Sequence, residues 1–272
     1  MLGIWMAPFK SYRSYQIFEW KAKRGNRFIH DSETLAFLKA VYTTSKEREM
    51  SVLKNNVLWR AQLGNDWRDV KVDDDYVEEP CPFEKKRMKP LLNMSTEGRI
   101  NPKGISYLYI ASDKETAMSE VRPWLNSYIS VGQFIILKDL RLIDCSFNFK
   151  KDFRIYPFNE PTPKKRKEAV WLDIDNAFSK PVNPSDNIAD YVPTQILSEF
   201  LKTKGYDGIV YKSTLGEGYN VVLFDINTAE LINCFLYKTK HVSFDFEKEP
   251  NQYFEQKHYK SKKIERGNKK DK

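Results

Sequence analysis

Two short apolar segments late in the chain constrain the fold most. GIVYKS (208–213) and YNVVLFD (219–225) have the length and residue types of strands, and the turn TLGEG separates them. NVLWRAQL (56–63) alternates like a strand, ISYLYIA (105–111) is a further strand segment, and 127–144 holds one or two more. Because helical segments are few and do not alternate regularly with these strands, the sequence predicts an α+β fold.

Three helices are predicted, one before the first strand and two between later strands. One begins at Asp31 or Ser32, which are suitable N-caps, and one runs from about 113 to 122 and ends before Pro123. A third opens at Pro193, because proline suits the first position of a helix.

The charge pattern divides the chain into three parts. Residues 1–55 are predicted to be a helical appendage and 56–240 the main domain, in which the proline-containing, charged segment 64–96 is a loop or insertion. Residues 146–190 are expected to be mostly irregular. Residues 241–272 are predicted to form a basic, disordered tail.

Composition excludes several classes of protein. No apolar stretch is long enough to span a bilayer, and the apolar run at the start is too short for a secretory signal. The three cysteines, Cys81, Cys145 and Cys234, are far apart and fit neither a disulfide framework nor a zinc site. We therefore expect a cytoplasmic protein without a membrane segment and without a bound metal.

The positive charge of the chain points only weakly to nucleic acid. Of the formal net charge of +8, residues 257–272 carry a net +6. The remainder is nearly balanced, so direct binding to nucleic acid is disfavoured, and a binding module that uses the basic tail is the third-ranked alternative.

Four polar residues stand out by their position, Arg60, Arg99, Glu120 and Ser213, which ends a strand before a glycine turn. Arg60 lies in a largely apolar strand, Arg99 in a Gly/Asn/Pro loop, and Glu120 beside the apolar stripe of a helix. Each also has a structural interpretation: Arg60 and Glu120 could form an ion pair. Ser213 could be a turn residue and Tyr109 a packing residue of its strand.

The ordered motifs of this sequence resemble the RES domain family. The matching blocks are LWRAQ, GRINPKGISYLYIA, AMSEV and KGYDGIVYKSTLGEGYNVVLF, and they span about 56–226. The resemblance implies a fold similar to the ADP-ribosyltransferase toxins, with a mixed β-sheet and flanking helices around an NAD-binding cleft. The compact toxins of the family lack counterparts of 1–55, 64–96 and the tail.

The resemblance also implies an activity and partners. Family members are bacterial toxins of toxin–antitoxin systems that cleave NAD, the substrate, at the nicotinamide–ribose bond. Inorganic phosphate or water is the acceptor, which makes the enzyme an NAD phosphorylase or glycohydrolase, and the alternative is an ADP-ribosyltransferase that modifies a protein. The usual partner is a helix-turn-helix (Xre-like) antitoxin. The resemblance leaves open whether the protein also forms a homodimer.

Two arginines suit the phosphates of NAD. A guanidinium group matches phosphate oxygens with two parallel hydrogen bonds, so Arg60 and Arg99 are expected to bind the pyrophosphate. The chain has no GxGxxG motif, which disfavours a Rossmann-type dinucleotide site.

One carboxylate suffices for the proposed bond cleavage. Nicotinamide leaves as a neutral molecule, so no acid is needed to protonate it, unlike in glycoside hydrolysis. Glu120 is expected to stabilise the positive ribose of the transition state. By resemblance, Tyr109 would stack on the nicotinamide, Ser213 would hydrogen-bond ligand or glutamate, and Asn220 would add a polar contact.

Overall fold

The computed structural model describes residues 8–92, 94–147, 160–180 and 188–247. One compact unit extends to Lys240, and a second begins at His241. All helices and strands of the described residues belong to the first unit. None of these helices is long and apolar enough to cross a membrane. Most of the predicted tail, including the basic stretch 257–272, lies outside the described residues.

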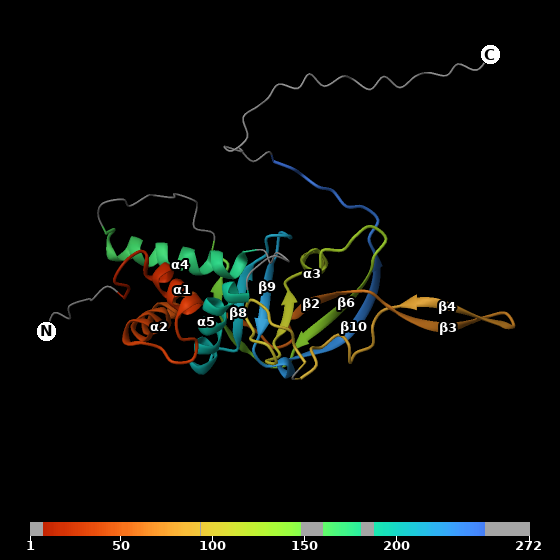
Figure 1. Ribbon diagram of the computed structural model, residues 1–272. Coiled ribbons are helices and arrows are strands. Elements are labelled where there is room, and N and C mark those ends of the chain that lie inside the picture. Colours follow the sequence, from red (N-terminus) through yellow and green to blue (C-terminus); the bar gives the residue numbers. More distant parts are fainter. Residues whose placement is uncertain (1–7, 93, 148–159, 181–187, 248–272) are drawn as a thin grey trace, which may run out of the picture. The chain divides into compact units, whose positions relative to one another are not determined.

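A mixed sheet of eight strands forms the centre of the first unit, in the order β1-β7-β8-β9-β5-β2-β6-β10 (Figure 1). Only β7 and β8 are parallel, and the other neighbours are antiparallel. The strands are β1 (Glu49–Val52), β2 (Val57–Leu63), β5 (Leu108–Ala111), β6 (Tyr128–Ile136), β7 (Leu140–Cys145), β8 (Gly208–Lys212), β9 (Tyr219–Leu223) and β10 (Ala229–Lys238). The predicted α+β class, a mixed sheet with flanking helices, is confirmed.

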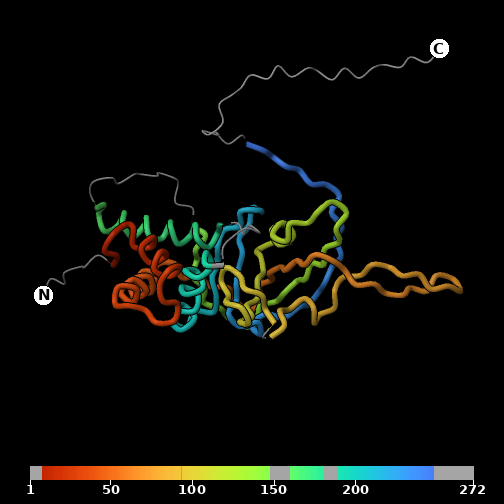
Figure 2. The backbone as a smooth tube through the Cα atoms, viewed as in Figure 1, coloured from red at the N-terminus to blue at the C-terminus, as the bar shows by residue number. Residues whose placement is uncertain are grey.

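Four helices pack together on one face of the β7–β8–β9 half of the sheet. They are α1 (Ser14–Arg24), α2 (Ser32–Ser45), α4 (Pro163–Ser179) and α5 (Val192–Thr203). Phe18, Val41, Trp171 and Leu197 from these helices share one apolar core with Ile209 of β8. Helix α1 is far in sequence from α4 and α5, but the three helices lie side by side (Figure 2).

The other face of the sheet has its own apolar core. Leu108, Phe134 and Leu223 belong to it, and Phe83 and Met88 of the segment before β5 pack against them. A short helix, α3 (Lys114–Glu120), contacts β2, β5 and β6 near the middle of the sheet. The side chain of Asp113 caps α3 by accepting a hydrogen bond from the amide of Thr116, so the helix begins at Lys114. It ends at Glu120 and is therefore shorter than the predicted 113–122.

The N-terminal residues do not form the expected appendage. Helices α1 and α2 contribute to the core, and β1 pairs with β7. Arg48, directly before β1, forms a buried ion pair of 2.7 Å with Asp175 of α4, and its guanidinium lies 4.3 Å from the ring centre of Trp171. The described residues of 1–55 instead complete the same body as the strands that follow them.

Two segments expected to be irregular contain regular structure. The charged segment 64–96 forms a hairpin of β3 (Asp66–Val72) and β4 (Asp75–Cys81), which projects from the body (Figure 1). Its side chains are mostly exposed, so it lacks the apolar alternation that identifies a strand. Within 146–190, residues 148–159 and 181–187 are outside the described part, but α4 is a helix of 17 residues.

Candidate functional site

The central sheet is weakly joined between β2 and β5. Strand β2 pairs with β6 along its whole length, from Val57 to Leu63, but with β5 only through Trp59 and Ala111. A cavity of about 1050 Å³ opens at this place. Its walls come from β2, β5, α3, β8 and β9, together with the loop before β5 and the end of α4. We call this cavity the cleft.

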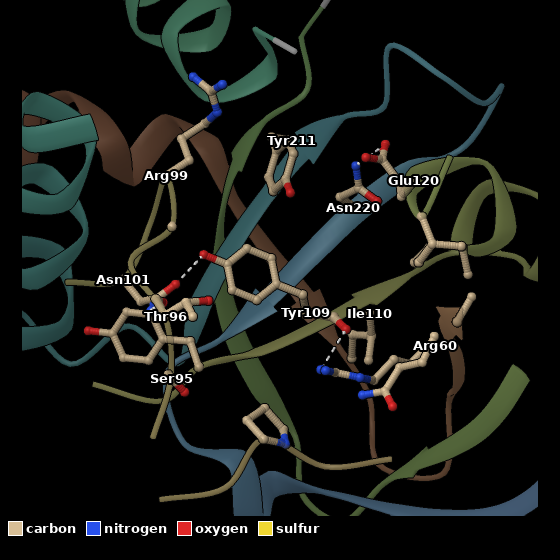
Figure 3. Close-up of a pocket in the computed structure, with 18 of the residues that line it drawn as sticks. Arg60, Ser95, Thr96, Arg99, Asn101, Tyr109, Ile110, Glu120, Tyr211 and Asn220 are labelled. Atoms are coloured by element: carbon tan, nitrogen blue, oxygen red, sulfur yellow. Dashed lines mark hydrogen bonds between the residues drawn. The ribbon is translucent and has the colours of Figure 1, made fainter. Parts of the chain in front are cut away.

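The cleft brings together most of the predicted site residues. Arg60, Arg99, Tyr109, Glu120 and Asn220 all line it, although they come from four strands or helices and one loop (Figure 3). The sixth, Ser213, is 1% exposed and lies directly behind Glu120.

Glu120 is held by two hydrogen bonds to the same oxygen. Its Oε1 accepts one from the Ser213 hydroxyl at 2.6 Å and one from the Asn220 amide at 2.7 Å. The Ser213 oxygen in turn accepts hydrogen bonds from the backbone amides of Leu215 and Gly216, so its hydrogen is left for the carboxylate. No hydrogen bond to Oε2 is found among the described residues, and this oxygen is free for a ligand.

The glycine turn after β8 packs against the first turn of α3. The amide of Gly218 donates to the Thr116 hydroxyl at 3.1 Å. A Cβ on Gly218 would lie 2.1 Å from Oδ2 of Asp113, and one on Gly216 would lie 2.9 Å from Cα of Thr116. Only glycine allows this approach, and the turn thereby fixes Ser213 relative to the helix that carries Glu120.

Arg60 is a half-buried cation, and no acidic side chain of the described residues pairs with it. Its Nη1 makes one long hydrogen bond of 3.5 Å to the carbonyl of Tyr109, and its buried Nε has no hydrogen-bond partner in the part of the chain that the structure describes. Burial lowers the pKa of Arg60 to about 10, so the group is still charged at neutral pH. No ion pair joins Arg60 to Glu120 in the described part of the chain, which argues against the structural interpretation of the two residues.

Arg99 points away from the centre of the cleft, toward α4 (Figure 3). Its Nη1 donates to the carbonyl of Ala177 at 2.8 Å, and its guanidinium lies 5.5 Å from the ring centre of Tyr191. Its buried Nη2 has no hydrogen-bond partner among the described residues. The α5 residue Thr194 holds the Arg99 carbonyl by a hydrogen bond of 2.6 Å. The two predicted arginines therefore share the cleft, but Arg99 uses part of its guanidinium within the protein.

The hydroxyl of Tyr109 is used within the protein. It donates to Oδ1 of Asn101 at 2.7 Å and accepts from the amide of Ile100. Burial raises the pKa of Tyr109 well above its usual value, so the group is neutral. The ring still lines the cleft and can contact a flat ligand.

Two further residues of the site were not predicted. Asn101 donates to the carbonyls of Thr96 and Ile105 and so shapes the loop that carries Arg99. Tyr211 of β8 lines the cleft together with Tyr109. Both lie inside the quoted motifs, and the alternation of β8 could have identified Tyr211, because it places this residue on the same side as Ser213.

Positive side chains outnumber negative ones around the cleft. The acids are Glu97 and Glu120, and the cations are Arg60, Lys86, Arg87, Lys89, Arg99, Arg122, Lys180 and Lys212. Such a lining attracts an anionic ligand. Among the described residues, no three His, Cys, Asp or Glu side chains gather as metal ligands.

The chain matches a known family over most of its length. The family model of the RES domain matches residues 57–247. The crystal structure of the M. tuberculosis MbcT–MbcA toxin–antitoxin complex is similar at a TM-score of 0.40 and 13% identity, and the match covers 74% of this chain and 92% of that one. No curated protein matches the chain. With the motifs converging on one cleft and the family model covering the entire site, the chain belongs to the RES domain family.

Proposed function

We propose that this protein cleaves NAD at the bond between nicotinamide and ribose. The observation that carries the proposal is the carboxylate of Glu120, held through one oxygen in a cationic cleft, with no hydrogen bond from the described residues to the other oxygen. One carboxylate is enough for this reaction, because nicotinamide leaves without needing a proton from the protein.

The chemistry assigns a role to each residue of the site. Glu120 stabilises the ribose as positive charge develops on C1 and the bond to nicotinamide breaks. The Ser213 and Asn220 hydrogen bonds hold the carboxylate in place before the reaction. Tyr109 and Tyr211 offer aromatic surface for the nicotinamide ring, and Arg60 binds a phosphate group.

The excess of cations favours an anionic acceptor over water. Inorganic phosphate would then attack C1 of the ribose, and the products would be nicotinamide and ADP-ribose 1''-phosphate. Attack by water would give ADP-ribose, and transfer to a protein would give a labelled protein. Incubation of the purified protein with NAD, with and without phosphate, and analysis of the products distinguishes the three reactions.

The deciding result is the release of nicotinamide by the wild-type protein. Release that requires phosphate supports the phosphorylase, and release without phosphate supports the glycohydrolase. If NAD is untouched under all conditions, including incubation with cell extract as a source of acceptor proteins, the proposal is wrong.

We also propose, from family membership, that a helix-turn-helix antitoxin binds the protein and blocks its activity. Co-expression of this chain with an Xre-like helix-turn-helix protein would test the pairing. The two proteins should copurify, and nicotinamide release should fall in the complex.

A further inference from the structure

We infer that Arg122 is an anion-binding residue of the cleft and holds a phosphate group beside Glu120. The inference rests on the proposed function, because it assigns a ligand group to the same cleft. The phosphate belongs either to the pyrophosphate of the dinucleotide or to free inorganic phosphate.

The backbone of Arg122 is in an unusual conformation. Four non-glycine residues among those described have a positive φ: Asn55, Asp73, Arg122 and Asn126. Asparagine and aspartate are the residues that tolerate this left-handed region, whereas arginine is disfavoured there. Arg122, with φ of 47°, is therefore the exception that needs an explanation.

The position of Arg122 connects this conformation to the site. The residue comes two positions after Glu120, and its amide donates to the carbonyl of Ser119 at 3.0 Å at the end of α3. It also precedes Pro123, which disfavours the right-handed helical conformation. A glycine or asparagine would make the same turn with less strain, so the turn alone does not account for an arginine. Strain of this kind is concentrated at functional sites.

The side chain of Arg122 has no structural task among the described residues. It is exposed and lines the cleft, and it forms no ion pair with an acidic side chain of the described chain. Arg99, by contrast, binds the carbonyl of Ala177 with its Nη1. Arg122 is thus a second guanidinium, after Arg60, that is free to form two parallel hydrogen bonds to phosphate oxygens.

The charge of Arg122 fits a phosphate ligand for a second reason. An unpaired cation near Glu120 would oppose the positive charge that develops on the ribose. A phosphate bound to Arg122 removes this conflict, because its negative charge offsets that of the guanidinium.

Replacement of Arg122 by glycine tests the role of the side chain without disturbing the turn, because glycine adopts a positive φ readily. Arg122→Gly removes the guanidinium and relieves the left-handed strain, so the KM for NAD or for phosphate should rise about tenfold or more while Tm does not fall. Asn126→Gly is the matched control: it has a φ of 65°, lies in the same loop and does not line the cleft. It should keep both KM values.

The two sources of phosphate give different results. A rise in the KM for NAD alone places the pyrophosphate at Arg122, and a rise in the KM for phosphate alone places the acceptor there. If Arg122→Gly keeps both KM values, Arg122 does not bind either group and the inference is wrong.

A binding measurement decides the inference even if the protein does not consume NAD. Inorganic phosphate and pyrophosphate should raise the Tm of the wild-type protein and of Asn126→Gly more than that of Arg122→Gly. Equal shifts in all three proteins, or no shift in any, would overturn the inference. Absence of nicotinamide release from the wild-type protein refutes the proposed function alone.

Discussion

Ser213 donates its hydroxyl hydrogen to Oε1 of Glu120 over 2.6 Å, although the two residues are 93 positions apart in the chain. The bond joins the end of β8 to the end of α3, and the glycine turn after β8 keeps the two elements together. It makes Ser213 a positioning residue, since the serine is buried behind the carboxylate and does not line the cleft.

The first prediction concerns this bond. Ser213→Ala should lower kcat about tenfold with little change in KM, because a charge-assisted hydrogen bond of about 1.5 kcal/mol holds the carboxylate in its reactive position. Steady-state measurement of nicotinamide release checks it. Ser198→Ala is the matched control, because Ser198 is equally buried and bonds the carbonyl of Thr194 away from the cleft. A Ser213→Ala protein with normal kcat would show that the bond is only structural.

The second prediction concerns the charge of Glu120. Glu120→Gln keeps the shape and an oxygen that can accept from Ser213 and Asn220, but it removes the negative charge. Nicotinamide release should fall about 100- to 1,000-fold at unchanged Tm. Glu115→Gln, an exposed change on the same helix, should be silent. Full activity of Glu120→Gln would remove the carboxylate from the mechanism.

The third prediction compares two arginines, the half-buried Arg60 and the buried Arg48. Arg60 has no acidic partner among the described residues, whereas Arg48 pairs with Asp175. Arg60→Met removes an uncompensated charge, so Tm should stay or rise while the KM for NAD rises about tenfold or more. Arg48→Met leaves Asp175 buried without its partner and should cost about 3–5 kcal/mol.

Thermal unfolding and kinetics of the two variants check the comparison. The expected pattern is opposite: lost substrate binding without lost stability for Arg60→Met, and lost stability for Arg48→Met. A strongly destabilised Arg60→Met would mean that Arg60 is part of the framework and not a ligand residue.

The site was more predictable from sequence than the fold around it. Arg60, Arg99, Tyr109, Glu120 and Asn220 lie in short motifs, and the structure places all five around one cleft. The direction of Arg99 was not predictable, because it depends on the carbonyl of Ala177, which is 78 residues away. Asn101 was missed for a similar reason: its importance lies in a bond to the Tyr109 hydroxyl.

Helix α4 and the β3–β4 hairpin were not predicted, and they differ in how clearly the sequence indicates them. Val170, Trp171, Ile174 and Phe178 of α4 are buried and fall at helical spacing, so this helix could have been predicted despite its charged first turn. The side chains of the β3–β4 hairpin are mostly exposed, so the hairpin has no apolar face and no alternation marks it. Exposed strands have no alternation of apolar and polar residues, so sequence periodicity cannot identify them.

The last prediction concerns pH. Asp173 of α4 accepts a hydrogen bond from Gln16 at 3.3 Å, and burial, followed by the nearby charge of Glu19, raises the pKa of its carboxyl to about 6. The folded protein therefore holds a proton there at pH values where the unfolded chain has lost it, so stability falls as pH rises from about 4 to about 6. Asp173→Asn should remove this loss, with a gain of about 1 kcal/mol at pH 7, after allowance for partial exposure, and none near pH 3. Denaturant unfolding at the two pH values measures the difference, and Asp69→Asn, an exposed change in β3, is the control. An equal effect of Asp173→Asn at both pH values would show that the pKa of this carboxyl is the same in the folded and the unfolded protein, so that burial between α1 and α4 does not raise it.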